Sequence, residues 1–197
     1  MRAIYDYIIY TDGGCERNPG GRGGYGAVII NNSTGELTDI SGGFRSTTNN
    51  RMEVMAVIKA LEKIEKGTHI QLFSDSQYVI KTMNGMFRKK KNIDLWKKLD
   101  KLAIAFEIEW NWVKGHNGNT YNEKCDTLCQ EAMTLPELEE DVGYMNTDSV
   151  PEQSDTVAQS LEKYNMYPDC SDVESYQEKY LVNPICAKLI CQFYKQN

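Results

Sequence analysis

The chain has 197 residues, of which 41% are hydrophobic and 25% charged, a composition typical of a globular domain with an appendage. No stretch approaches the roughly 20 consecutive apolar residues of a membrane-spanning helix, and the first ten residues carry charges instead of a signal-type apolar run. We therefore expect a soluble, cytoplasmic protein without membrane association. Its six unevenly spaced cysteines form no CxxC pair, so we expect reduced thiols and neither a disulfide scaffold nor a zinc site.

The net charge of -6 is unevenly distributed along the chain. Residues 1–133 contain 18 basic and 16 acidic side chains, a net charge of +2, whereas residues 134–197 contain 4 and 12, a net charge of -8. Because surfaces that bind nucleic acids are usually basic, the acidity of the second part does not exclude such binding by the first. We predict a catalytic domain at 1–133, an acidic, turn-rich linker at 134–152 and a small helical extension at 153–197.

The first part of the chain has the pattern of three antiparallel strands. Apolar runs at 7–10 and 25–30 flank a glycine-rich turn, and a third strand is expected at about 37–44, after the turn residues 31–35. Short connections of this kind join antiparallel neighbours.

Helices and strands alternate after residue 44. Thr47 to Asn50 are good N-cap residues for a helix whose apolar positions recur as far as Gly67. The following elements are expected at 69–73 (strand), 76–83 (helix), 93–106 (helix), 107–113 (strand) and 119–133 (helix). This order predicts an α/β fold with a mixed five-stranded sheet and helices on both faces.

Four carboxylates lie where these elements begin or end. Each has a simpler explanation: Asp12 as a turn former, Glu53 as an acid near a helix N-terminus, Asp75 as the start of a helix, and Asp126 as a surface acid. If the elements converge at one end of the sheet, however, the four charges repel one another unless divalent cations neutralise them. Clustered carboxylate oxygens favour Mg²⁺ or Mn²⁺, and a pair of such ions promotes phosphodiester hydrolysis.

Four sequence motifs carry a resemblance to a known family. They are YTDGGCERNPGGRGGYGAVI at 10–29, TTNNRMEVMAVIKALE at 47–62, FSDSQYVI at 73–80 and WVKGHNGNTYNEKCDTL at 112–128. In this order they resemble type I ribonuclease H, and the resemblance covers about residues 1–133. It implies the ribonuclease H-like fold and an endoribonuclease that hydrolyses the RNA strand of RNA/DNA hybrids with two Mg²⁺ ions, Mn²⁺ being a substitute, to leave 5′-phosphate and 3′-hydroxyl ends.

The resemblance also implies roles for individual residues. Asp12, Glu53, Asp75 and Asp126 match the metal-binding carboxylates, and His116 matches a mobile histidine that assists proton transfer or product release. The substrate contacts that it implies are Cys15, Asn18, Thr48, Asn49 and Gln77, together with Glu53 beside the RNA strand. Thr48 and Asn49 could instead be only helix caps, and His116 only a solvated loop residue.

One segment departs from the best-known bacterial members of the family. Those proteins carry an extra basic helix between the positions of Met83 and Ile93, and here only NGMFRKKK remains. The basic run 88–91 could contact backbone phosphates or form a solvated surface. The departure concerns affinity for the hybrid, since the carboxylates are all present.

Two alternatives to a hybrid-cleaving enzyme are weighed. A non-catalytic binding module, with the extension as its functional part, has no need to concentrate like charges. An enzyme of the same fold acting on another substrate, such as a retroelement or transposase domain, is disfavoured by the paired TTNNR and KGHNG motifs. The extension at 153–197 is expected to pack on the domain, to stay loose or to bind a protein partner.

Overall fold

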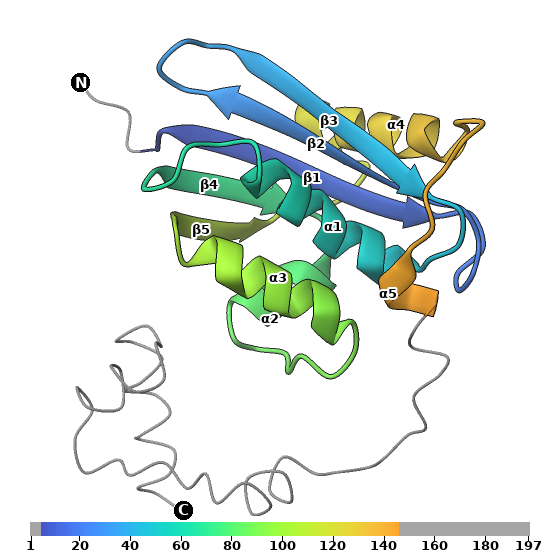
Figure 1. The fold of residues 1–197 in the computed structure, drawn as a ribbon. Coiled ribbons are helices and arrows are strands. Elements are labelled where there is room, and N and C mark those ends of the chain that lie inside the picture. The colour runs from blue at the N-terminus through green and yellow to red at the C-terminus, as the bar shows by residue number, and fades with distance from the viewer. Residues whose placement is uncertain (1–4, 146–197) are drawn as a thin grey trace, which may run out of the picture. The chain divides into compact units, whose positions relative to one another are not determined.

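The computed structural model describes residues 5–145 (Figure 1). Its elements are β1 (Tyr7–Cys15), β2 (Gly23–Asn31), β3 (Leu37–Phe44), α1 (Asn49–Leu61), β4 (His69–Ser74), α2 (Gln77–Met83), α3 (Ile93–Ala103), β5 (Glu107–Trp112), α4 (Thr120–Met133) and α5 (Val142–Met145). The strands form one sheet in the order β3-β2-β1-β4-β5. The pairs β1–β2 and β2–β3 are antiparallel, and the pairs β1–β4 and β4–β5 are parallel. The predicted mixed five-stranded sheet is confirmed.

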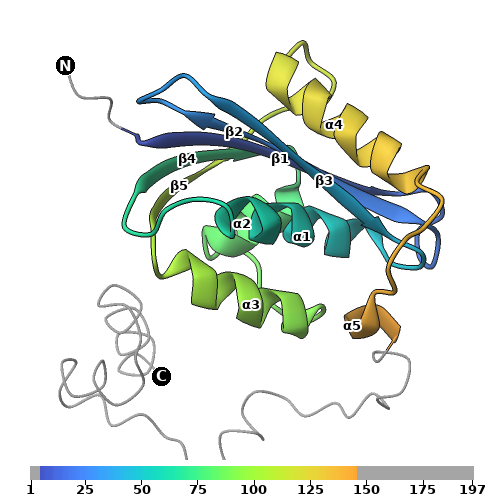
Figure 2. The same cartoon turned by 45° about the horizontal axis from the view of Figure 1, so that its top comes forward.

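Helices cover both faces of the sheet. Figure 2 shows α4 on one face, and α1 with α2 and α3 on the other. Helix α1 is the central element of the core, since every residue from Arg51 to Leu61 except Lys59 is buried. Within residues 5–145, none of the helices is long and apolar enough to cross a bilayer.

Both strands extend into the glycine-rich segment, which corrects the prediction of strands only at 7–10 and 25–30. β1 continues to Cys15 and β2 begins at Gly23. Gly13 and Gly24 are therefore both strand residues, each with a partner on the neighbouring strand. The physical reason is close packing of the helices. A Cβ atom on Gly13 would lie 2.3 Å from the backbone nitrogen of Glu53, and one on Gly24 would lie 2.1 Å from the carbonyl oxygen of Cys129.

The main helices begin where the sequence predicts, but two of them end earlier. Thr48 caps α1, where its hydroxyl accepts a hydrogen bond from the backbone N–H of Arg51. α1 ends at Leu61, well before Gly67, and α3 ends at Ala103, before Phe106. Gly67, with a φ of 81°, belongs to the turn that leads into β4. Ile64 and Phe106 lie beyond the ends of α1 and α3 and still pack on the core. The apolar pattern therefore continues past the last helical residue.

The first part of the predicted linker packs on the domain, which corrects its expected start at residue 134. Leu138 and Asp141 are buried, Glu139 forms a β-bridge with Phe44, and residues 142–145 form α5. The remainder of the linker and the helical extension at 153–197 lie outside the described residues. Cys15, Cys125 and Cys129, the cysteines of the described part, are free thiols.

Candidate active site

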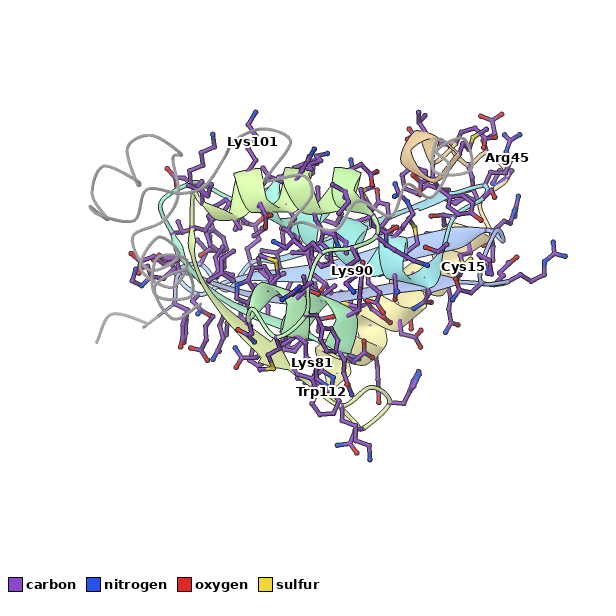
Figure 3. The ribbon with its side chains drawn as sticks, turned by 90° about the horizontal axis from the view of Figure 1, so that it is seen from below. Cys15, Arg45, Lys81, Lys90, Lys101 and Trp112 are labelled. Atoms are coloured by element: carbon purple, nitrogen blue, oxygen red, sulfur yellow. The ribbon has the colours of Figure 1, made fainter. Side chains whose placement is uncertain are left out.

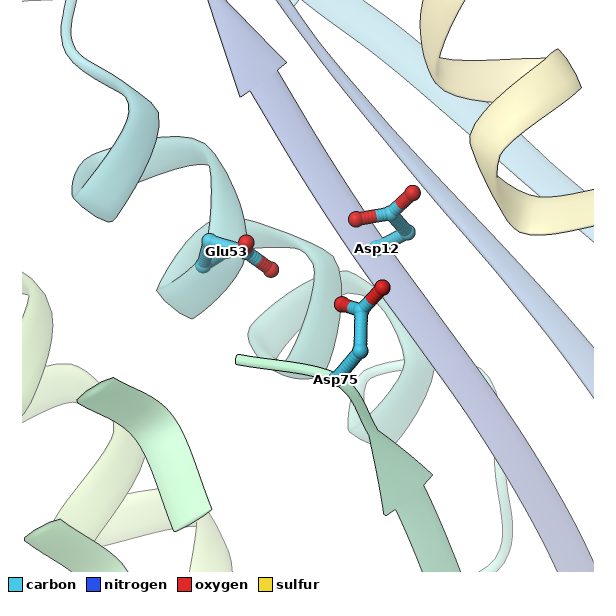
Figure 4. Close-up of side chains that lie close together, drawn as sticks. All are labelled: Asp12, Glu53 and Asp75. Carbon is cyan, nitrogen blue, oxygen red and sulfur yellow. The ribbon is translucent and has the colours of Figure 1, made fainter. Parts of the chain in front are cut away.

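Three carboxylates from three different elements meet at one end of the sheet. Asp12 belongs to β1, Glu53 to α1, and Asp75 directly follows β4. One oxygen of each lies within 4.8 Å of the others, and Figure 4 shows the three side chains gathered in this way. The cluster brings together three of the four carboxylates that the sequence indicates.

The backbone explains why these residues converge. In the parallel pair of β1 and β4, Thr11 and Ser74 are the last paired residues, so Asp12 and Asp75 follow at the point where this pairing ends. Asp12 is still within β1, whereas Asp75 follows β4. Glu53 approaches from α1, because Gly13 has no side chain to separate β1 from the helix backbone. The site is therefore assembled by the sheet register and by one glycine.

The cluster is electrostatically unfavourable without a counterion. Burial, followed by the charge of Asp75, raises the pKa of Asp12 to about 7. Burial, followed by the charges of Asp12 and Asp75, raises the pKa of Glu53 well above its usual range. The Oε2 atom of Glu53 is buried and has no hydrogen-bond partner. Since an unpaired buried carboxylate oxygen is costly, and since all donors here are hard oxygens, the residues fit a divalent cation such as Mg²⁺ or Mn²⁺.

Asp126 lies near this group but is not a member of it. Its Oδ1 atom accepts a hydrogen bond from Gln130, and its Oδ2 atom lies 3.8 Å from the Nδ1 atom of His116. Its charge nevertheless contributes to the raised pKa of Asp12. His116 has a φ of 49° in an exposed loop, and its side chain is 79% exposed. The predicted histidine therefore stands beside the cluster, next to the fourth carboxylate.

Asn122 is a site residue that the sequence reasoning did not single out. Its side-chain amide donates a 3.2 Å hydrogen bond to Oδ2 of Asp75, and its own Oδ1 atom is buried without a partner. Asn119 caps α4 by accepting hydrogen bonds from two backbone N–H groups, which fixes where the helix starts. The spacing of four residues between Asn122 and Asp126 places both on one helix face and is the signal that could have revealed it.

The predicted substrate contacts fall into two places. Asn18 accepts a 3.2 Å hydrogen bond from the backbone N–H of Asn49, next to the cap residue Thr48, and the thiol of Cys15 lies 3.6 Å from the carbonyl oxygen of Thr47. These residues thus belong to two adjoining loops. Gln77 stands apart at the start of α2, where its side chain accepts a hydrogen bond from Lys81.

A groove of about 900 Å³ opens beside the first group. Its lining includes the polar residues Asn18 and Thr48 and a basic wall made of Arg88, Lys90 and Lys91. Figure 3 shows Lys90 on the loop between α2 and α3 and Cys15 at the end of β1. The groove therefore combines neutral polar groups with a basic wall, a combination that suits a phosphate backbone. The short basic run of the sequence contributes directly to this surface.

Comparisons with known proteins agree with this arrangement. Residues 5–134 match the family described as RNase H. Ribonuclease H of Aeromonas salmonicida is 46% identical over 149 residues, which cover 69% of this chain and 95% of that protein. Ribonuclease HI of Shewanella oneidensis is also 46% identical over 149 residues, which cover 69% of this chain and 92% of that protein.

Two solved structures are similar. The N-terminal RNase H domain of a Mycobacterium tuberculosis protein has a TM-score of 0.58 at 25% identity, covering 73% of this chain and 99% of that one. LC11-RNase H1 in complex with RNA/DNA hybrid has a TM-score of 0.54 at 26% identity, covering 64% of this chain and 96% of that one.

Proposed function

This chain belongs to the ribonuclease H family of hydrolases, and from that membership and the carboxylate cluster we propose that it is an endonuclease that hydrolyses the RNA strand of RNA/DNA hybrids. The family predicted from the four motifs is thereby confirmed. The single observation that carries the proposal is the convergence of Asp12, Glu53 and Asp75 within 4.8 Å, with an unpartnered oxygen on Glu53.

We assign the cluster to two Mg²⁺ ions, for which Mn²⁺ is an expected substitute. Such ions, when bound, lower the pKa of water and stabilise the leaving oxygen of a phosphodiester. Asp12, Glu53 and Asp75 supply the oxygen ligands. Asp126 completes the set if its side chain leaves Gln130, a rearrangement of one exposed hydrogen bond. The expected products are 5′-phosphate and 3′-hydroxyl ends.

The surrounding residues orient the reacting groups. Asn122 holds Oδ2 of Asp75 through its amide, which fixes the direction of that carboxylate. His116, on an exposed loop 3.8 Å from Asp126, is placed to exchange protons with solvent and to assist product departure. The cytoplasmic location expected from the sequence stays a prediction.

Recognition of the hybrid is assigned to the groove and the adjoining loops. LC11-RNase H1 has been solved with an RNA/DNA hybrid, which supports the same class of substrate here. The 2′-hydroxyl is the group that distinguishes the RNA strand from DNA. Asn18, Thr48, Asn49, Cys15 and Gln77 are the proposed contacts. These groups and the basic wall are expected to contact the phosphates and sugars of the hybrid and not its bases. Cleavage is therefore expected at many base sequences.

The direct test is a comparison of substrates. The full chain is incubated with end-labelled RNA/DNA hybrid, double-stranded RNA and single-stranded RNA, each with Mg²⁺, with Mn²⁺ and with a chelator. We expect cleavage of the hybrid alone, dependent on a metal ion. The fragments should be 5′-phosphorylated, so that a ligase joins them and prior treatment with phosphatase abolishes the joining. Equal cleavage of single-stranded RNA, or no cleavage of the hybrid with either metal, would refute the proposal.

A further inference from the structure

A buried ion-pair network lies next to the proposed substrate loops. Arg51, in the first turns of α1, is 1% exposed. Its Nε and Nη2 atoms donate 2.7 Å hydrogen bonds to the two carboxylate oxygens of Asp141, and its Nη1 and Nη2 atoms donate bonds of 2.9 and 2.7 Å to Asp94. Asp141 is itself 3% exposed. One guanidinium therefore joins α1, α3 and the segment 138–145.

The network extends to the loop that carries two proposed substrate contacts. The Thr47 hydroxyl donates a 2.6 Å hydrogen bond to Oδ2 of Asp141. Thr47 directly precedes Thr48 and Asn49, and it is buried. Thr47 and Arg51 both donate hydrogen bonds to the carboxylate of Asp141. Asp141, from the C-terminal part of the domain, therefore holds both ends of the segment 47–51.

Thr47 also holds the glycine-rich loop. Its carbonyl oxygen accepts a 2.8 Å hydrogen bond from the N–H of Gly20, and its own N–H donates a 3.0 Å bond to the carbonyl oxygen of Gly21. Asn18, in the same loop, accepts from the N–H of Asn49. The position of Asn18 consequently depends on Thr47, and through it on Asp141.

The segment 138–145, which carries Asp141, forms part of the groove. Asp94, Gly143 and Tyr144 line it together with Asn18 and Thr48. A Cβ atom on Gly143 would lie 2.0 Å from Oδ2 of Asp94 and 2.3 Å from Nη2 of Arg51, so α5 packs directly on the ion pairs. The network is therefore continuous with the groove wall. In the carboxylate cluster, Asp12 lies on β1 and Asp75 follows β4, whereas Glu53 shares α1 with Arg51 and lies where the helix backbone contacts Gly13.

We propose that Asp141 is a positioning residue for substrate binding: through Arg51 and Thr47 it fixes the two loops that present Asn18, Thr48 and Asn49 to the hybrid. This inference rests on the proposed function and adds a residue outside the resemblance that the motifs carry. Neutralising Asp141 leaves the buried Arg51 with Asp94 as its remaining carboxylate partner and weakens the acceptor of the Thr47 hydroxyl, so we expect the loops to rearrange. Asp12 and Asp75 lie outside the network, and Glu53 keeps the contact of the α1 backbone with Gly13. Binding should therefore weaken while the chemical step is preserved.

The test compares Asp141→Asn with Asp141→Glu in the full chain. Steady-state cleavage of the hybrid gives KM and kcat, measured at a temperature where both variants are folded. We expect Asp141→Asn to raise KM by about tenfold or more with kcat within about twofold, since contacts made equally in the ground state and the transition state affect binding and not the chemical step. Asp141→Glu, which keeps the charge, should recover part of the loss.

A stability control separates positioning from simple destabilisation. Leu102→Ala, at the far end of α3, lowers the melting temperature without touching the network, and it should leave KM unchanged. An equal rise of KM in Leu102→Ala, or an unchanged KM in Asp141→Asn, would overturn the proposal.

A second readout does not depend on cleavage. Hydrogen exchange of the amides of Gly20, Thr47 and Asn49 should accelerate in Asp141→Asn, because the partners of these N–H groups lie in the two loops. Unchanged exchange there would overturn the inference even if the enzyme is active. Accelerated exchange together with an inert wild-type enzyme would instead contradict the proposed function alone.

Discussion

Gly13 packs against the backbone of Glu53, and this contact brings the carboxylate of Glu53 to that of Asp12. A Cβ atom at position 13 would lie 2.3 Å from both the Glu53 nitrogen and the Met52 carbonyl carbon, which are backbone atoms and cannot swing away. Gly13, the residue that follows Asp12, thus sets the distance between β1 and α1.

Substitution Gly13→Ala should therefore separate the two elements. We expect a loss of about 2 to 3 kcal/mol in the free energy of unfolding, as for overpacked cores, and a large fall in kcat. Gly14→Ala is the matched control, because its Cβ would meet the side-chain sulfur of Cys129 at 3.1 Å, a group that can adjust. Urea unfolding and hybrid cleavage of both variants check this. Equal losses in the two would contradict the account.

The raised pKa of Asp12 predicts how the stability of the metal-free protein changes with pH. Its pKa is 3.8 in an unperturbed side chain and about 7 in the folded protein. Between these values the folded state binds more protons than the unfolded state, so stability falls as pH rises from about 4 to 7 and stays low above.

Substitution Asp12→Asn should remove this penalty. At pH 8 with a chelator we expect a gain of about 2 kcal/mol, or a melting temperature several degrees higher, after allowing for partial exposure of the group. Asp39→Asn, on the surface of β3, is the control and should gain nothing. Thermal unfolding at pH 4 and pH 8 measures the effect, and a variant that is no more stable than wild type at pH 8 would argue against burial of the charge.

Asn122 is predicted to orient Asp75. Asn122→Ala removes the amide that donates to Oδ2 of Asp75, and we expect kcat to fall by about 10- to 100-fold with a smaller change in KM, as for residues that orient a metal ligand. Asn32→Ala, which removes a side-chain amide bonded to the Tyr5 carbonyl oxygen far from the cluster, is the control. If both variants retain full kcat, Asn122 has no orienting role.

The basic wall of the groove is predicted to contact the substrate backbone. The double substitution Lys90→Ala with Lys91→Ala should weaken hybrid binding equally for different base sequences. It should also reduce the slope of log affinity against log salt by about one to two. Lys98→Ala with Lys101→Ala, on α3 away from the groove, changes the net charge by the same amount and should leave the slope nearly unchanged. Fluorescence anisotropy at several salt concentrations compares the two pairs.

The sequence predicted the sheet and the helix starts because caps and apolar periodicity are local. It missed the strand character around Gly13 and Gly24, since glycine normally marks a turn and only tertiary packing of α1 and α4 reveals its other use. Asp141 was assigned to a linker because acidic, proline-containing stretches are usually solvated. Its pairing with Arg51, 90 residues away, is a tertiary contact that no local pattern encodes.

In the candidate site too, local signals could be predicted from the sequence and tertiary contacts could not. Asp12 and Asp75 could be found from the motifs and the strand ends, and the sheet register then brings them together. Asn122 was overlooked because its role depends on a hydrogen bond to Asp75, 47 residues away, and its only local signal is the spacing of four residues from Asp126. The position of Asp126, bonded to Gln130 and close to His116, depends on side-chain orientation, which a sequence does not specify.

The converging carboxylates should make this chain a metal-dependent nuclease for RNA/DNA hybrids. The decisive experiment measures the rate at which wild type, Asp75→Asn and the surface control Asp39→Asn cleave a labelled hybrid with Mg²⁺. Circular dichroism confirms that all three are folded. We expect full activity in wild type and Asp39→Asn and a loss of at least about a thousandfold in Asp75→Asn. A folded Asp75→Asn that cleaves the hybrid at the wild-type rate would contradict it.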